Sequence, residues 1–364
     1  MLLRLHRWMG LTIGLLVAAI ALSGSATVAI ADVERWVGLH GTPGDGRAPF
    51  AADQAAIAEA FPGAVSDNLF PADAPGRPDR VEVVVRTADA KEEFAVFCDP
   101  ATGRVIGDTR GSRLVGFLRA VGAFHGNLFL PGPVGSTLLG VSGLALLLFA
   151  ASGLWLWRGA SGGGRLLVWH RLTGAVVLPV LVASAATGVL FSWQWARPLA
   201  YRALGGDPAA LPYFAMTDEQ RAAFRGSGEG TPLDIDAIVA AARAQPVAAG
   251  TGQVLRITSL ASKAAKPVKV AFDFPGNGDH RAGGVVVQVD RITGKPAFID
   301  DPRGRSPGGW LLSRQWSFHA GRWGSSASFG GTVARIAWIL GGLGIAGLAV
   351  SGAALRLRRR PRAA

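Results

Sequence analysis

The segment LTGAVVLPVLVASAATGVLFSWQWA, residues 172–196, decides the fold class of this chain. It carries no charged side chain, and it exceeds the roughly 20 apolar residues that cross the hydrocarbon core of a bilayer. Three further stretches, at about 8–31, 134–157 and 331–355, have the same apolar character. As buried helices of a soluble protein they would need polar faces, which they lack. The sequence therefore predicts an α-helical membrane protein with four transmembrane helices.

Composition and charge agree with this class. Of the 364 residues, 49% are hydrophobic and 17% are charged, and the net charge is +12. A basic soluble protein would suggest nucleic-acid binding, but all acidic residues lie between Asp32 and Asp301, and none lies between Asp108 and Asp207. This layout predicts contact with membrane lipid and no nucleic acid. The single cysteine, Cys98, excludes an internal disulfide, a Cys-based metal site and c-type haem attachment.

Arginines without acidic neighbours mark three short segments: the N-terminus, the connection 158–171 and the tail. The positive-inside rule places such segments in the cytoplasm. We therefore expect a multi-pass protein of the bacterial inner membrane with both termini cytoplasmic and both long connections periplasmic. A cleaved signal peptide at the N-terminus is the alternative, and it would leave three spans.

These assignments divide the chain into ten segments. In order they are TM1 with the cytoplasmic N-terminus (1–31), periplasmic module 1 (32–110), an interfacial His-bearing segment (111–133), TM2 (134–157), a cytoplasmic loop (158–171), TM3 (172–196), periplasmic module 2 (197–305), a second interfacial His-bearing segment (306–330), TM4 (331–355) and a basic cytoplasmic tail (356–364).

The order of these segments is an internal duplication. Each half has a histidine where a span opens, a Ser/Thr–Gly pair within that span, a second histidine after the outer block, and a Ser–Gly pair in the next span. In the first half these are His6, Ser23-Gly24, His125 and Ser152-Gly153. In the second half they are His170, Thr187-Gly188, His319 and Ser351-Gly352.

The two outer blocks are also alike. Each has a helical stretch, DQAAIAEAFPGA or LDIDAIVAAARAQ, followed by segments in which apolar residues alternate, such as VEVVVRT and VKVAFDF. An Asp-x-x-Thr-Gly turn interrupts the alternation at Asp99–Gly103 and at Asp290–Gly294. Period-two alternation broken by such a turn indicates a β-hairpin. Each block is predicted to be a small α+β module with one helix on a short antiparallel sheet.

These motifs carry a resemblance that covers nearly the whole chain. The strand-Asp-x-x-Thr-Gly-strand signature resembles the PepSY module, and the HRWMGL start with the FHGN and FHAGRWG segments resembles the PepSY-associated transmembrane helix family. Some members of that family are ferric-siderophore reductases that hold b-type haem between histidines of their helices. The resemblance implies haem-ligating roles for His6, His125, His170 and His319.

The physical reading of these histidines leads to the same cofactor. Ionisable residues at membrane depth are costly and are usually functional, and two imidazoles on one haem iron favour electron transfer. His6 and His170 both begin outward-running spans, whereas His125 and His319 both precede inward-running spans. We therefore expect two pairs at two depths, His6 with His170 and His125 with His319, and two b-type haems. A single histidine at a membrane interface is more commonly a headgroup contact, so the duplication carries this prediction.

Several other polar residues are also considered for a role at the site. Arg7 and Arg171 follow the first two histidines and suit haem propionates, although positive-inside topology explains them equally well. Arg314 and Arg322 flank His319 and are candidates for an outer haem or an anionic ligand. His40 is predicted to be a loop residue, and His280 has no assigned role. Rossmann, Ser-His-Asp, HExxH and P-loop patterns are absent from the sequence.

The function predicted from these observations is electron transfer to a periplasmic ferric siderophore or other ferric chelate, an oxidoreductase activity. The electrons would come from a quinol or from a separate cytoplasmic donor. The alternative is a non-enzymatic membrane protein that binds or regulates a periplasmic partner through its PepSY-like modules. A third reading is an accessory subunit for metal uptake that has no redox step of its own.

Overall fold

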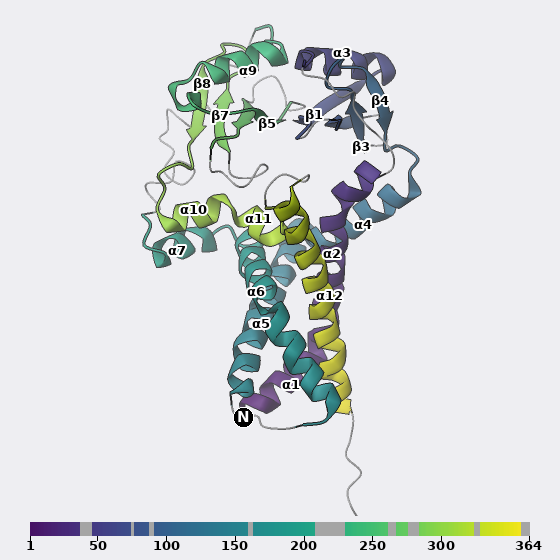
Figure 1. The fold of residues 1–364 in the computed structure, drawn as a ribbon, viewed down its shortest axis with the longest axis vertical. Helices are drawn as coiled ribbons and strands as arrows, with labels where there is room; N and C mark the ends of the chain where they lie inside the picture. Colours follow the sequence, from purple (N-terminus) through teal and green to yellow (C-terminus); the bar gives the residue numbers. More distant parts are fainter. Residues whose placement is uncertain are drawn as a thin grey trace, which may run out of the picture.

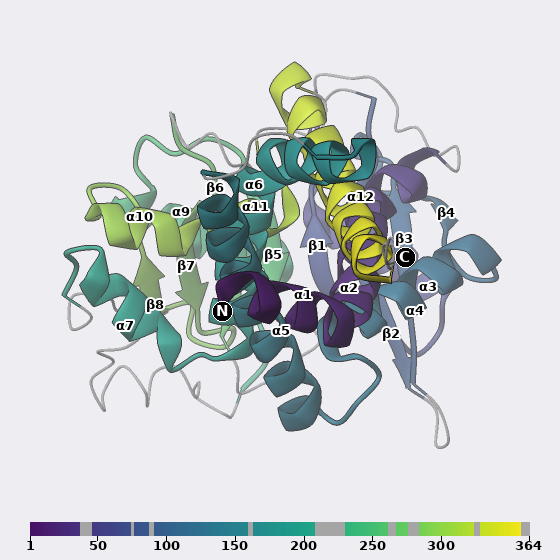
Figure 2. The same ribbon diagram turned by 90° about the horizontal axis from the view of Figure 1, so that it is seen from below.

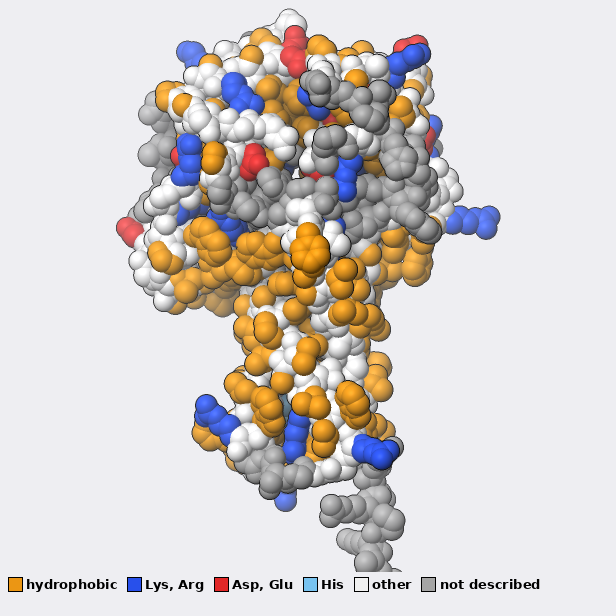
Figure 3. Space-filling model, viewed as in Figure 1, with side chains coloured by type: hydrophobic (Ala, Val, Ile, Leu, Met, Phe, Trp, Pro, Cys, Tyr) orange, Lys and Arg blue, Asp and Glu red, His pale blue; other side chains and the backbone are white. Residues whose placement is uncertain are grey.

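A helical stem and a β-sheet occupy the two ends of the molecule (Figure 1). The computed structural model describes residues 1–36, 46–73, 76–86, 91–158, 163–207, 230–260, 267–275, 284–323 and 328–357. The stem is apolar on its visible face, and Lys and Arg side chains gather at its free end, away from the sheet (Figure 3). This distribution is that of a membrane-embedded stem with a water-exposed head.

Three helices of the stem are each long and apolar enough to cross a membrane. They are α5 (Gly132–Trp157), α6 (Arg165–Ser192) and α12 (Phe329–Leu357). A fourth crossing is available only if α1 (Leu2–Thr12) and α2 (Gly14–Trp36), which meet at a bend of 60°, count as one span. The part of the chain that the structure describes thus has three candidate spans, or up to four.

The expected span at 8–31 contains this bend. The Thr12 hydroxyl donates to the carbonyls of Trp8 and Met9, and Gly14 follows one residue after the break. Hydroxyl bonding to the preceding turn and a nearby glycine are common causes of helix bending. Helix α1 therefore turns aside and lies across the free end of the stem, in contact with α5 and α12 (Figure 2).

Small residues bring the stem helices close together. Helix α12 packs against α2 and α6, and α5 packs against α6. A Cβ at Gly341 would lie 2.6 Å from Val180 Cγ1, and one at Gly344 would lie 2.5 Å from Val177 Cγ1. The Ser25 hydroxyl of α2 donates to the Ile339 carbonyl of α12 at 3.1 Å. Close backbone approach through small residues and interhelical hydrogen bonds is how helices associate in lipid.

Short helices lie between the stem and the sheet (Figure 1). They are α4 (Arg113–Asn127), α7 (Ala196–Ala203), α10 (Pro307–Ser313) and α11 (Gln315–Ala320). The two expected His-bearing segments, 111–133 and 306–330, thus contain helical structure, which holds His125 on α4 and His319 on α11.

The sheet contains strands from both outer blocks. Its strands are β1 (Ala64–Phe70), β2 (Asp79–Arg86), β3 (Lys91–Cys98), β4 (Val105–Asp108), β5 (Val254–Thr258), β6 (Val268–Phe272), β7 (Val285–Val289) and β8 (Pro296–Asp300). They form one eight-stranded sheet in the order β4-β3-β2-β1-β5-β6-β7-β8, with every pair antiparallel. Helices α3 (Phe50–Ala60) and α9 (Ile235–Arg243) cover it, and the 3-10 turn η2 (Pro246–Ala248) follows α9.

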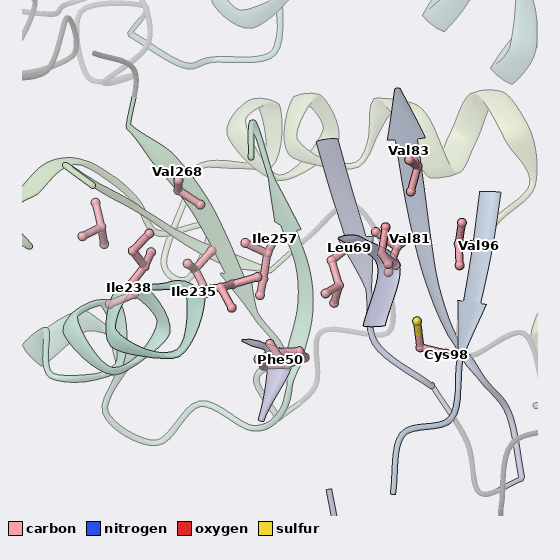
Figure 4. Packing of buried hydrophobic residues seen from close by; sticks show 14 of the residues in the cluster. Phe50, Leu69, Val81, Val83, Val96, Cys98, Ile235, Ile238, Ile257 and Val268 are labelled. Atoms are coloured by element: carbon pink, nitrogen blue, oxygen red, sulfur yellow. The ribbon is translucent and has the colours of Figure 1, made fainter. Parts of the chain in front are cut away.

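This sheet corrects the expectation of two separate modules. Strands β1 and β5, one from each block, pair at Leu69 and Ile257, and the buried side chains of both blocks form one hydrophobic cluster. Figure 4 shows that cluster running from Val96 in the first block, past Leu69 and Ile257, to Ile238 in the second. The two blocks therefore share a core, which removes two exposed strand edges at once.

The two predicted turns are present where the hairpins close. The Asp99 carboxylate accepts from the Ala101 N–H at 2.8 Å, and Asp290 accepts from the N–H groups of Ile292 and Thr293 at 2.9 and 2.8 Å. Gly103 has a φ of +70° and sits so close to α3 that a Cβ would lie 2.5 Å from that of Ala52. The turn therefore needs glycine for its backbone and for its contact with the helix.

Candidate functional site

Two of the four predicted histidines line one cavity near the free end of the stem. His6 comes from α1 and His170 from α6, and we call them the stem-end pair. The cavity contains about 870 Å³ not filled by atoms, part of it open to the surroundings. Apart from the two imidazoles and Arg171, its wall is apolar and includes Phe149 and Leu178.

Each imidazole of the stem-end pair is held by the span that closes its own half of the chain. His6 Nδ1 lies 2.7 Å from the Ser152 hydroxyl of α5, and His170 Nδ1 lies 2.8 Å from the Ser351 hydroxyl of α12. The Phe149 ring meets the His6 ring edge-on at 5.6 Å between centroids. Both rings are therefore fixed by a polar contact on Nδ1.

The other two histidines meet at the sheet end of the stem. His125 of α4 and His319 of α11 have ring centroids 5.9 Å apart, and we call them the sheet-side pair. Their planes are inclined at 45°. The Phe191 ring of α6 meets the His319 ring edge-on at 5.3 Å.

The imidazoles of the sheet-side pair have two polar contacts each. His125 Nδ1 lies 3.1 Å from the Ser23 hydroxyl and 3.0 Å from the Ile20 carbonyl, both on α2. His319 Nδ1 lies 3.2 Å from the Thr187 hydroxyl and 3.0 Å from the Ser184 carbonyl, both on α6. Each histidine thus uses a Ser or Thr of its own half, while each pair joins the two halves.

The two pairs lie at different levels of the stem. Helix α1 is at the free end, and α4 and α11 are beside the sheet (Figure 1). Within the described residues, no three or more His, Cys, Asp or Glu side chains are grouped so as to hold a bare metal ion. A pair of imidazoles suits instead a metal that brings its other ligands with it, as haem iron does.

The remaining predicted residues divide into those near a pair and those away from one. Arg171 lines the stem-end cavity, whereas Arg7 is exposed. Arg314 is buried, with its guanidinium 4.7 Å from the ring centroid of Trp310. His40 and His280 lie outside the described residues.

Sequence reasoning did not assign the partners of the histidines. The Ser/Thr–Gly pairs were visible as a repeated motif, but no local pattern says which of them meets which histidine. The aromatic contacts of Phe149 and Phe191 were not anticipated. The sequence did contain a signal for these contacts: Phe149 lies one helical turn before Ser152, and Phe191 lies one turn after Thr187. Residues at this spacing share a face of a helix.

Comparison with known proteins identifies one family. The family model for the PepSY-associated TM region matches residues 3–359. No curated protein matches the chain.

Proposed function

The chain belongs to the family of the PepSY-associated TM region, and from this premise we propose that it is an inner-membrane protein that holds two b-type haems and transfers electrons to a periplasmic ferric chelate. The observation that carries this proposal is that histidines from the two halves come together at two levels of an apolar stem: His6 and His170 line one cavity, and the rings of His125 and His319 are in contact.

The proposed topology has four spans, with α1 and α2 together as the first. This topology places the free end of the stem in the cytoplasm, because the segments at that end carry basic residues and no acidic ones. The positive-inside rule assigns such segments to the cytoplasmic side. These residues are Arg4, Arg7, Arg158, Arg165, Arg171 and Arg356. The sheet, which has the acidic residues and the mixed-charge surface, then faces the periplasm.

The residues of the two pairs fit a haem by their donor chemistry. At the sheet-side level the two imidazoles that would hold the iron have ring centroids 5.9 Å apart. At the other level, His6 and His170 would hold the iron and face an apolar cavity. Arg171 on the wall of that cavity would supply a guanidinium, which matches a propionate carboxylate.

A b-type haem with two imidazole ligands supplies reversible one-electron transfer. The role of the protein is to place the ligands, to exclude water with the apolar wall of the stem, and to keep the two sites at fixed levels. Because each pair takes one histidine from each half, ligand binding would also tie the halves together.

The proposed substrate is ferric iron in an oxygen-ligand chelate such as a siderophore complex. Each ferric ion accepts one electron, so a quinol donor would reduce two ferric ions and release two protons. A separate cytoplasmic one-electron donor would reduce one. Reduction weakens the hold of hard oxygen ligands on the iron and so releases it.

The test is a dithionite-reduced minus oxidised spectrum of the detergent-purified full chain, with haem content per chain. We expect two reducible b-type haems in the wild type and about one in His170→Ala, with His280→Ala as the histidine control. The reduced protein should then be reoxidised by a ferric chelate, with ferrous iron trapped by a colour reagent. Absence of haem would overturn the proposal in favour of a protein that binds a periplasmic partner. Haem without reoxidation by ferric chelates would overturn the substrate assignment.

A further inference from the structure

Each of the four histidines meets a Ser/Thr–Gly pair in the same way. The hydroxyl contacts Nδ1, and the glycine that follows lies beneath Cε1, the ring carbon between the two nitrogens. A Cβ on these glycines would lie 2.9 Å from Cε1 at Gly24, 3.4 Å at Gly188, 3.5 Å at Gly352 and 3.7 Å at Gly153. The contact is therefore built four times from a hydroxyl residue followed by a glycine.

The hydroxyl contacts decide which ring nitrogen carries the proton. A hydroxyl has one hydrogen to donate. The Ser152 hydroxyl donates to the Leu148 carbonyl at 2.6 Å, and the Ser351 hydroxyl donates to the Leu348 carbonyl at 3.2 Å. When the hydroxyl hydrogen goes to its own helix in this way, the hydroxyl oxygen accepts from the imidazole, an arrangement that puts the proton of His6 and His170 on Nδ1.

The sheet-side pair leads to the same assignment by a second route. The Ser23 hydroxyl donates to the Ile20 carbonyl at 2.8 Å, and the Thr187 hydroxyl donates to the Ala183 carbonyl at 2.6 Å. In addition, His125 Nδ1 faces the Ile20 carbonyl and His319 Nδ1 faces the Ser184 carbonyl. A carbonyl accepts and never donates, so these imidazoles also carry the proton on Nδ1.

We propose that the four Ser/Thr–Gly pairs are positioning sites that hold each histidine as the Nδ1–H tautomer and leave Nε2 as the unprotonated donor for haem iron. The hydroxyl sets the tautomer, and the glycine admits the edge of the ring against the helix backbone. Ligating histidines commonly have their second nitrogen fixed in this manner. The iron-binding part rests on the proposed function, whereas the tautomer part does not.

The two histidine pairs differ in how strongly the Nδ1–H tautomer depends on the Ser or Thr hydroxyl. Removal of the Ser152 or Ser351 hydroxyl takes away the acceptor described for that Nδ1. Removal of the Ser23 or Thr187 hydroxyl leaves a backbone carbonyl at 3.0 Å in each case. The hydroxyl should therefore matter more at the stem end, a difference that a merely structural role for these residues would not produce.

The experiment is nitrogen NMR of the full chain labelled with 15N-histidine, purified in detergent with haem removed. Each signal is assigned by its loss in the corresponding His→Ala variant. We expect four histidines as the Nδ1–H tautomer, loss of that preference for His6 in Ser152→Ala, and retention for His125 in Ser23→Ala. Ser152→Thr should restore the wild-type pattern. Ser136→Ala is the matched control on α5, since that hydroxyl donates within its own helix, to the Gly132 and Pro133 carbonyls.

A second measurement on the haem-loaded protein tests the role toward iron. Ser152→Ala should weaken binding of the stem-end haem by about 10-fold or more and shift its reduction potential, while Ser136→Ala changes neither. An unchanged nitrogen pattern in Ser152→Ala would overturn the positioning role. The expected nitrogen pattern in a chain that takes up no haem would instead overturn the proposed function and leave the tautomer assignment standing.

Discussion

The two halves of the chain make the same histidine contacts from helices of different geometry. The first half opens with α1 and α2, which are bent by 60°, whereas the second half opens with α6, a single 28-residue helix that has Pro179 inside it. Even so, His6 and His170 each reach a serine hydroxyl at 2.7 and 2.8 Å. The side-chain contact is therefore repeated where the helix geometry is not.

The same holds beside the sheet. The first half places His125 on a 15-residue helix capped by Ser112, and the second places His319 on a 6-residue helix that follows a break at Arg314. The two rings still meet at 5.9 Å. The histidine contact is therefore kept in both halves although the lengths of the helices that carry the histidines differ.

The covering helices of the sheet show an asymmetry of another kind. Helix α3 begins after Pro49, which provides no side-chain cap, and Asp236 of α9 accepts from its Phe50 and Ala51 N–H groups at 3.0 and 2.8 Å. Helix α9 is capped by its own Asp234. The N-terminus of the helix in the first half is thus capped by a residue of the second half. Among the described contacts, no residue of the first half caps α9.

The largest expected effect tests whether equivalent histidines in the two halves are equal partners. His6→Ala and His170→Ala should each remove the stem-end haem, about half of the total, and the double variant should lose no more than either one. Haem content and the reduced spectrum measure this. If His6→Ala kept both haems, the bent α1 would not contribute a ligand and the pairing would be wrong.

The next effect concerns the glycines beneath the sheet-side rings. A Cβ at Gly24 would lie 2.9 Å from His125 Cε1, closer than real contacts allow, whereas one at Gly188 would lie 3.4 Å from His319 Cε1. Gly24→Ala should therefore cost about 1–3 kcal/mol of packing at this site and loosen its haem, and Gly188→Ala should cost less. Haem retention during thermal unfolding compares them. Equal behaviour of the two variants would contradict the steric argument.

A pH effect distinguishes the first half of the sheet region. Burial raises the pKa of Asp53 to about 8, with the Asp79 charge adding to the rise and Arg47 opposing it. Because the folded-state pKa lies above the ordinary value of 3.8, the stabilisation from protonated Asp53 is complete at low pH and is lost as pH rises toward 8. The melting temperature of the sheet region should fall over that interval, and Asp53→Asn should flatten the slope. An unchanged slope in that variant would assign the pH dependence elsewhere.

The smallest expected effect tests the cap that joins the halves. Asp236→Ala removes the acceptor from the first turn of α3 and should cost about 1 kcal/mol. Asp234→Ala removes the cap of α9, where the carboxylate accepts from Ala237 N at 2.7 Å, and should cost about the same. Chemical denaturation measures both. Only the Asp236 variant should increase hydrogen exchange in α3, which belongs to the other half, and increased exchange of α9 alone would contradict the cross-half cap.

Much of the architecture could be predicted from local sequence because it depends on local properties. Apolar length predicts the spans at 134–157 and 172–196, and the Asp-x-x-Thr-Gly turns predict the hairpins. The bend within the first apolar stretch was not predicted, because hydropathy takes no account of the Thr12 hydroxyl bonds and of Gly14 beside the bend.

The candidate site divides in the same manner. The duplication by itself marked the four histidines as one set of equivalent positions. Their positions relative to the spans predicted which two share a level. Only the tertiary structure decided that Ser152 faces His6, that β1 joins β5 in one sheet, and that Asp236 caps α3. These are contacts between segments far apart along the chain, and they follow from how the helices pack and where the strand edges meet, which no local period or composition encodes.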